Sequence, residues 1–351
     1  MHRRDLLKFL QSGLVATAAS VVIPSSAFAA PDDKGEKKDK RPIALLVPLS
    51  GERARLGLSM RQAALLAENS ALVLSFDTGG TAAGAAAAAV LALKKAPALI
   101  LGPLLADEVP AVTSTVAGRV PIIAFSNDSV LKAPGTYIFG ITAAQVTSAV
   151  LRYARGRGVR TVAVIDDGSP WSVAAMLEAS HMGTELGLRI RALEVRTGAP
   201  VPDAGEAPDA VLIPGSGPAV LAAARNLKDT GVQLLGTFQA LDHSPDALAV
   251  LDGAWLASPD PVAFGTFAGE FAARNGTQPG TIAGLAYDAA GIANSLRAAG
   301  KLNPEGLLGS EGFHGVTGPV RFRTDGSVAR DFAIVVARPG GYEPVAVSSG
   351  S

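Results

Sequence analysis

The sequence of 351 residues contains no cysteine, which excludes disulfide bonds, cysteine nucleophiles and cysteine-ligated metals. Aromatic residues make up only 5% of it, so the core must be built mainly from Ala, Val, Leu and Ile. An excess of one charge is also missing, because Lys and Arg total 31 and Asp and Glu total 31. The chain as a whole therefore has no electrostatic attraction for nucleic acid or for an anionic membrane.

A hydrophobic run long enough to span a membrane is absent as well. The apolar stretch 9–23 is short, follows a basic start that includes Arg3 and Arg4, and precedes the A-x-A pattern 27–29. This arrangement predicts a signal peptide over residues 1–29, cleaved near Ala29, and export to the periplasm. The paired arginines leave the twin-arginine and the Sec export routes both open.

The segment 30–41 that follows, PDDKGEKKDKR after its first residue, has no apolar side chain to bury and is expected to be a charged tether. Without cysteine at the cleavage site, we expect the mature chain not to be anchored in a membrane by a lipid. About 320 residues then remain, enough for one or two domains.

From Arg41 onward, apolar strands alternate with helices, as in parallel sheets that are covered on both faces. The pattern predicts strands at 43–47, 71–76, 98–101, 120–125, 161–165, 188–195, 209–213, 232–235 and 254–257. It predicts helices at 58–69 (after a loop 50–57), 81–96, 142–157, 171–186, 218–230, 261–275 and 281–299. A hairpin around Asp325-Gly326 joins strands 319–323 and 331–337, and 198–208 is a loop.

Five stretches resemble the type I periplasmic binding-protein fold of the leucine-binding-protein family: IALLVPLSGERARLGLSMRQAALLA, ILGPLLADEVPAV, VPIIAFSND, LAYDAAGIANSL and GFHGVTGPVRFRTDG. Within that family, segments beginning at IAFSNDSVLKAPG and QLLGTFQALDHS are most similar to the penicillin-binding-protein activators. The resemblance implies an α/β fold with two lobes, each a parallel sheet flanked by helices, and a hinge of several crossings. We expect lobe 1 at 42–140 plus 261–315, and lobe 2 at 141–260 plus 316–348.

Ligands of parallel sheets bind outside the carboxyl ends of the strands, where backbone N–H groups and helix N-termini converge. This rule and the resemblance together select a set of candidate residues for a cleft that binds a ligand. They are Ser50, Arg53, Gly102, Pro103, Ala106, Ser126, Asn127, Asp128, Trp171, Ser216, Phe238 and Gln239.

Transport members of the family hold the charged ends of an amino acid, and this chain departs from them at the matching positions. Ala106 stands where a hydroxyl residue meets the ligand carboxylate, and Asp128 stands where a threonine does so. Phe238 replaces the carboxylate that meets the ammonium, and Ser216 replaces an aromatic cover. Since a buried ammonium without a counter-charge is costly, the amino-acid clamp is predicted to be largely missing.

Several candidates have a plainer structural interpretation. Trp171 is either a stacking platform for a ligand or a half-buried anchor within its lobe. Arg53 and Arg55 either bind an anion or are solvated loop residues. Asp128 either lines the cleft or caps a turn, and Asp288, in LAYDA, is expected to tie its helix to the hinge rather than to bind a ligand.

No catalytic pattern stands out. The histidines lie apart from any partner at metal spacing, and no nucleophile elbow, phosphate loop or dinucleotide fingerprint occurs. We therefore expect no enzyme, no cofactor and no metal. The expected function is that of a penicillin-binding-protein activator-like factor whose partner is a cell-wall synthase. The alternative is the solute-binding protein of an ABC importer, whose partner is a permease; a small-molecule ligand in the cleft is left open.

Overall fold

In the computed structural model, which describes residues 39–196, 206–215, 218–228, 230–241 and 243–350, a first sheet of five parallel strands has the order β2-β1-β3-β4-β5. Every residue of β1 and β3 is buried, because helices cover both faces of this sheet. The strands are β1 (Ile43–Val47), β2 (Val73–Asp77), β3 (Leu99–Leu101), β4 (Ile122–Ala124) and β5 (Thr136–Ile138).

The side chains of β1 alternate between two hydrophobic clusters, one on each face of the first sheet. Leu45 packs in the cluster that includes Met60 of α1, whereas Leu46 packs with the alanines of α2 and the valines of α3. The small side chains of α2 let this helix lie close to the sheet. The helices are α1 (Ala54–Ala67), α2 (Ala82–Leu93) and α3 (Glu108–Val116), and short 3-10 turns lie at η1 (Ser70–Leu72) and η2 (Ser129–Leu131).

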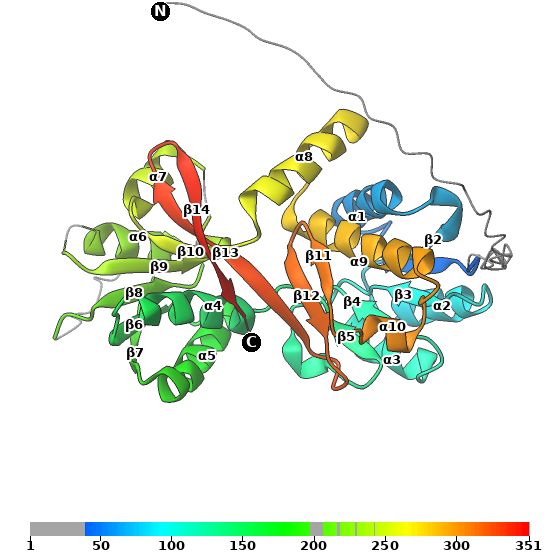
Figure 1. Ribbon diagram of the computed structural model, residues 1–351, viewed down its shortest axis with the longest axis horizontal. Helices are drawn as coiled ribbons and strands as arrows, with labels where there is room; N and C mark the ends of the chain where they lie inside the picture. Colours follow the sequence, from blue (N-terminus) through cyan, green and yellow to red (C-terminus); the bar gives the residue numbers. More distant parts are fainter. Residues whose placement is uncertain (1–38, 197–205, 216–217, 229, 242, 351) are drawn as a thin grey trace, which may run out of the picture. The chain divides into compact units, whose positions relative to one another are not determined.

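The second sheet has nine strands and is mixed, in the order β11-β12-β13-β10-β9-β8-β6-β7, with β14 paired to β13. The run β10-β9-β8-β6-β7 is parallel, whereas β11, β12, β13 and β14 join it through antiparallel pairs. Its strands are β6 (Thr161–Asp166), β7 (Arg189–Glu194), β8 (Ala210–Ile213), β9 (Gln233–Thr237), β10 (Trp255–Ser258), β11 (Phe313–Gly315), β12 (Gly318–Phe322), β13 (Val328–Arg338) and β14 (Gly341–Ser349) (Figure 1).

The remaining helices begin at residues that satisfy their first free N–H groups. Thr142 and Gln145 form a capping box at the start of α4, and Ser169 caps α5 ahead of Pro170. These helices are α4 (Ala143–Gly156), α5 (Pro170–Leu186), α6 (Pro218–Leu227), α7 (Pro245–Leu251), α8 (Pro261–Asn275), α9 (Thr281–Ala298) and α10 (Pro304–Leu307), with a 3-10 turn η3 (Phe238–Ala240). No described helix is both long enough and apolar enough to cross a membrane.

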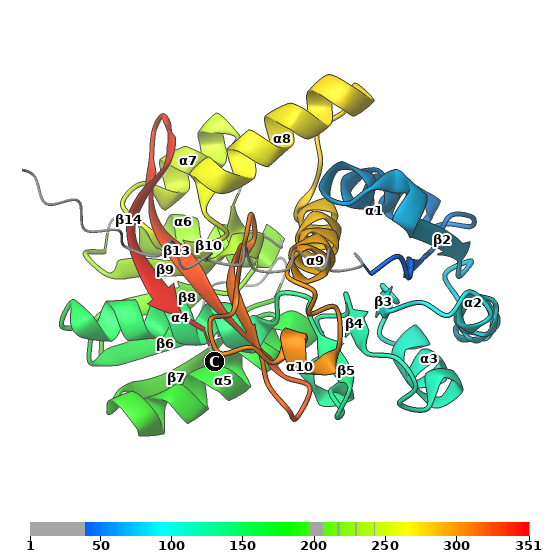
Figure 2. The ribbon, with the colours of Figure 1, turned by 45° about the vertical axis from the view of Figure 1, so that its right-hand side comes forward.

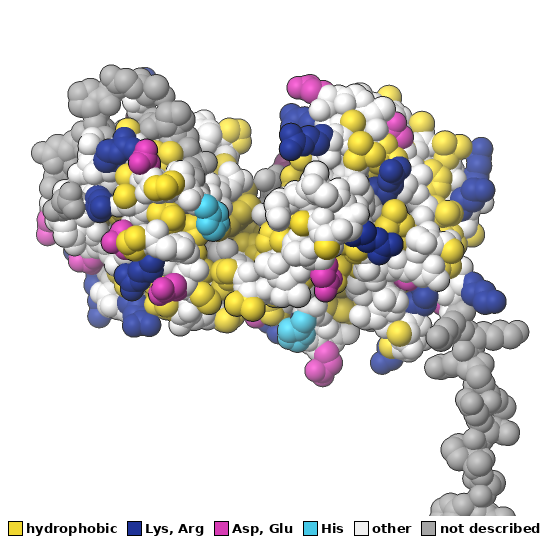
Figure 3. Space-filling model, turned by 90° about the horizontal axis from the view of Figure 1, so that it is seen from above, with side chains coloured by type: hydrophobic (Ala, Val, Ile, Leu, Met, Phe, Trp, Pro, Cys, Tyr) yellow, Lys and Arg dark blue, Asp and Glu magenta, His cyan; other side chains and the backbone are white. Residues whose placement is uncertain are grey.

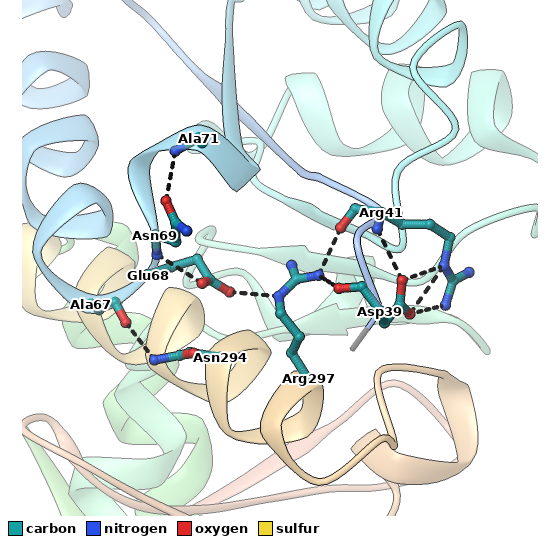
Figure 4. Close-up of polar contacts among 8 residues, drawn as sticks. All are labelled: Asp39, Arg41, Ala67, Glu68, Asn69, Ala71, Asn294 and Arg297. Carbon is teal, nitrogen blue, oxygen red and sulfur yellow. Dashed lines mark hydrogen bonds and ion pairs between the residues drawn. The ribbon is translucent and has the colours of Figure 1, made fainter. Parts of the chain in front are cut away.

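Helix α9 packs along α1, so a segment late in the sequence returns to the first sheet (Figure 2). A buried ion pair joins the carboxyl ends of α1 and α9, where Arg297 Nε lies 3.2 Å from Glu68 Oε2 (Figure 4). The same guanidinium donates to the carbonyl oxygens of Asp39 and Arg41, just before β1. Arg297 therefore fastens the start of the described chain to both helices.

A second buried polar network joins α9 to the start of β12, to β13 and to the end of the first sheet. Asp288 accepts hydrogen bonds from the N–H groups of Val316 and Thr317, at 2.7 and 2.8 Å, and from the Thr317 hydroxyl. Thr317 in turn accepts from Arg330, whose other terminal nitrogen donates to the carbonyl of Phe139 at 2.8 Å. Asp288 therefore ties its helix to the start of β12 and, through Thr317 and Arg330, to β13 and the end of β5, which supports the structural interpretation of Asp288.

Most of the predicted elements are present, with a few corrections. The loop predicted for 50–57 is too long, because α1 begins at Ala54 with Gly57 packed against the backbone of Pro48. Strands β5, β11 and β14 and helices α7 and α10 were not predicted, since each is short or partly exposed and lacks a clear apolar period. Most of the predicted loop 198–208 lies outside the described residues.

Candidate functional site

At the carboxyl edge of the first sheet, Asp77 ends β2 and organises the neighbouring loop. Its Oδ1 accepts the N–H groups of Leu49, Ser50 and Gly79, at 2.8, 3.2 and 2.8 Å. Partial burial raises the pKa of Asp77, but these bonds and one from the Ser50 hydroxyl outweigh it, so the pKa lies below its ordinary value. The candidate Ser50 is therefore held in place, while the candidate Arg53 is exposed at the start of α1.

The Gly102-Pro103 turn lies between β3 and α3 and is buried. Gly102 has φ +107° and donates to Ile123 at 2.7 Å, while the carbonyl of Pro103 accepts from Phe125 at 2.8 Å. A Cβ on Gly102 would lie 2.1 Å from the carbonyl oxygen of Leu46, so glycine is required there. The candidate Ala106, three residues further on, is exposed and offers no side-chain donor.

A buried carboxylate that the sequence reasoning missed lies just behind this turn. Glu108, in the first turn of α3, is fully buried, and its Oε2 accepts the N–H of Leu105 at 3.0 Å. Burial raises the pKa of Glu108, and this exceeds the opposing hydrogen bonds from Thr78 and from the backbone of Leu105. The available clue was an acidic residue at the start of the helix that follows the Gly-Pro turn, where a negative side chain is favoured.

We expect Glu108→Gln to become more stable relative to the parent as pH rises. The pKa of Glu108 is raised in the folded state. Its protonated side chain therefore contributes fully to the free energy of unfolding below the ordinary pKa of about 4.3, and this contribution is lost as the pH rises through the pKa of the folded state. The glutamine keeps an acceptor for Leu105 and never carries the buried charge. Urea unfolding should show similar stabilities at pH 4 and a variant about 1 kcal/mol more stable at pH 7.

The matched control for this experiment is Glu185→Gln. Glu185 pairs with Arg152 at 2.6 Å, and both side chains are more than a third exposed, so the stability of Glu185→Gln should differ little from that of the parent at either pH. If Glu108→Gln instead loses more stability at pH 7 than at pH 4, the carboxylate acts as a stabilising charge.

The loop after β4 carries three neighbouring candidates. Ser126 is buried, and its hydroxyl oxygen accepts the N–H of Asp128 at 3.1 Å. Asp128 Oδ1 in turn accepts the N–H of Val130 at 3.1 Å, while Asn127 is exposed. The Asp128 carboxylate thus caps the turn that starts η2, which is the plainer of its two interpretations.

At the carboxyl edge of the second sheet, two aromatic rings meet. The rings of Trp171 and Phe238 lie edge to face with centroids 5.8 Å apart. Trp171 Nε1 donates to the carbonyl of Pro214 at 2.8 Å, and the same oxygen accepts the Thr237 hydroxyl at 2.6 Å. The indole N–H is therefore used inside the lobe, which supports Trp171 as an anchor of α5 on β8 and β9.

The other candidates predicted for the carboxyl edge of the second sheet are Gln239 and Ser216. Gln239 has an exposed side chain, and its N–H donates to the Thr237 hydroxyl oxygen at 3.2 Å. Ser216 lies outside the described residues. Among the described residues, no hydrogen bond, ion pair or ring contact joins a candidate on the first sheet to one on the second. The contacts assemble two separate strand edges, each largely satisfied within itself.

Nothing in the described ranges resembles a metal centre, since no group of three His, Asp or Glu side chains could hold an ion there. Cavities on this part of the chain open elsewhere. One of them lies between α1, α9 and the residues before β1, and another lies at the amino-terminal end of β6 and β7. The candidate residues line neither of the two.

A family model for periplasmic binding proteins matches residues 41–342, and the chain belongs to this family. No curated protein sequence matches it. Among solved structures, it is similar to an ABC transporter substrate-binding protein from Sphaerobacter thermophilus, with 17% identity, TM-score 0.67, and coverage of 88% of this chain and 97% of that one.

It is likewise similar to the C-domain of LpoA from Haemophilus influenzae, a regulator of PBP1A, with 18% identity, TM-score 0.68, and coverage of 87% of this chain and 100% of that one. A solute-binding protein of an ABC transporter from Rhodopseudomonas palustris, in complex with 3,4-dihydroxybenzoic acid, matches with 18% identity, TM-score 0.62, and coverage of 89% and 97%. These likenesses confirm the two-lobed α/β fold of the leucine-binding-protein-like family.

Proposed function

We propose that this protein is a non-catalytic periplasmic factor that binds and activates a cell-wall synthase, as a penicillin-binding-protein activator does. The observation that carries the proposal is the chemistry at the positions of the amino-acid clamp. Ala106 has no donor, Asp128 uses its carboxylate to cap a turn, and the Phe238 ring packs on Trp171. The likeness in fold to the C-domain of LpoA, a regulator of PBP1A, supports the same function.

A free amino acid needs a counter-charge for each of its ends when it leaves water. A carboxylate ligand near Asp128 would meet a like charge, and an ammonium near Phe238 would meet an aromatic ring that cannot neutralise it. Each mismatch costs several kcal/mol in a closed site. The two strand edges are therefore poorly suited to binding a free amino acid for uptake.

Leucine, isoleucine and valine at millimolar concentration are expected to leave the melting temperature of the mature protein unchanged. A ligand at a hundred times its Kd would stabilise the folded state by about 2.7 kcal/mol, which a thermal-shift assay detects easily. A rise of several degrees with any of the three would contradict the missing clamp and return the protein to amino-acid uptake.

The test of the proposed function uses the mature chain from residue 30 and a purified bifunctional penicillin-binding protein from the same organism. We expect direct binding in the micromolar range and a faster rate of glycan or crosslink formation when the protein is added. Serum albumin at the same concentration is the control for nonspecific effects. Absence of both binding and activation would reject the proposal.

A second candidate function is the binding of an aromatic acid for an ABC importer. The observation that favours it is the pair Trp171 and Phe238 at the edge of the second sheet, together with the relative that holds 3,4-dihydroxybenzoic acid. Micromolar binding of that acid or of benzoate, measured by calorimetry, would support it over the activator. We infer export to the periplasm for both functions, from the leader predicted over residues 1–29.

A further inference from the structure

A basic groove of about 420 Å³ opens at the amino-terminal ends of β8, β6 and β7, away from the candidate edges. Three arginines line it: Arg160 just before β6, and Arg189 and Arg191 on β7. On the face shown in Figure 3, basic and acidic side chains are interspersed, and the protein as a whole carries no net charge. A groove with three guanidinium groups is therefore a local feature that composition does not explain.

Two acidic residues, Asp209 and Glu206, line the groove with the three arginines, so its lining keeps an excess of one positive charge. Asp209 Oδ2 accepts the N–H groups of Arg160 and Thr161, at 2.8 and 2.9 Å, and these bonds, with a smaller effect from the charge of Arg189, hold the pKa of Asp209 below its ordinary value. Arg191 Nη2 donates to the carbonyl oxygen of Glu206 at 2.6 Å. Among the described residues, no carboxylate lies within ion-pair distance of the three guanidinium groups.

Strand β7 also ends the second sheet. It pairs with β6 on one side, in a register that sets Arg189 opposite Thr161 and Arg191 opposite Ala163. Along its other side, no strand of the described residues pairs with it. Because side chains alternate along a strand, Arg189 and Arg191 share the face that lines the groove, about 6.6 Å apart. Among the described residues, an edge strand that lacks a second partner and two spaced cations thus coincide.

We propose that an extended acidic segment of the synthase binds along β7 as an added strand. Main-chain hydrogen bonds to the open edge would supply affinity, and carboxylates at alternate positions would meet Arg189 and Arg191. This inference rests on the proposed function and names the surface through which it acts. Charge complementarity selects an acidic partner, and the edge selects an extended one.

The experiment compares binding of the purified synthase to the parent protein and to Arg189→Glu/Arg191→Glu. We expect the variant to bind more than tenfold more weakly, and the parent's affinity to fall as salt is raised. The control is Arg321→Glu/Arg323→Glu, an exposed pair with the same spacing and the same change of charge, which should bind as the parent does. If the double variant unfolds, the single variant Arg189→Glu, at an exposed site, replaces it in the binding measurement.

Each alternative outcome is distinct. If the parent does not bind the synthase, the proposed function fails and this inference with it. If the parent binds and Arg189→Glu/Arg191→Glu binds equally well, only the groove is rejected, and the arginines merely keep an open strand edge soluble. If the variant instead loses binding to phosphatidylglycerol vesicles and keeps the synthase, the occupant is a membrane surface and the acidic segment is overturned.

Discussion

Asp288→Asn is expected to lower the free energy of unfolding by about 3–5 kcal/mol, the largest effect of any single polar substitution that we predict. The carboxylate is 4% exposed and accepts three hydrogen bonds, from Val316 and Thr317. An asparagine can accept at only one atom, and its NH2 group would face a donor. At least one buried donor would therefore lose its partner.

The loss extends to Arg330, which is 1% exposed and lies 4.8 Å above the ring of Phe139. Burial lowers the pKa of Arg330 to about 10, and the negative charge of Asp288 opposes this change. Thr317 bridges the two charged groups, and all hydrogen-bond partners of Arg330 are neutral. Loss of the negative charge of Asp288 would therefore leave the buried guanidinium without the charge that opposes its burial.

Denaturant unfolding at pH 7 measures this effect, with Asp325→Asn as the control. Asp325 pairs with Lys132 at 2.6 Å, but both side chains are more than 40% exposed, so its loss should cost less than about 1 kcal/mol. The double variant Asp288→Asn/Arg330→Met should recover part of the stability. A loss at Asp288 no larger than that at Asp325 would show that this buried network stabilises the fold no more than an exposed ion pair does.

Gly102→Ala is expected to lower the free energy of unfolding by about 3 kcal/mol or more. The same substitution should disturb the carboxyl edge of the first sheet. Two causes add: the φ of +107° strains any L side chain, and the new Cβ would lie 2.1 Å from the carbonyl oxygen of Leu46. Neither backbone can move freely, because Gly102 also donates to Ile123 between two buried strands.

Gly118→Ala separates the two causes. Gly118 also has a positive φ, +73°, but its Cβ would meet nothing within 4 Å. Its substitution should cost about 1 kcal/mol, the ordinary price of that conformation. Melting temperatures and urea midpoints of the two variants give the comparison. Equal losses would mean that the close approach of Gly102 to β1 is relieved by a small shift of the turn.

Local sequence patterns determined the class of fold and most of its elements. Strands such as Ile43–Val47 are continuous apolar runs because both faces of the sheet are covered. Helix α8 has the bounds that the sequence predicts, from Pro261 to Asn275. The absence of cysteine and the scarcity of aromatic residues also fixed the chemistry of the core before any contact was known. These features depend on neighbours in the chain.

The tertiary structure decided what the same residues do. Asp128 and Trp171 were each open to two interpretations. The indole of Trp171 found its partner across the fold, at the carbonyl of Pro214, whereas Asp128 bonds the N–H of Val130, only two residues away. Glu108 and the groove along β7 escaped prediction because burial and an unpaired strand edge arise only when distant segments pack. Spacing along a chain defines a helix or a strand, whereas the partner of a charge is chosen by the whole fold.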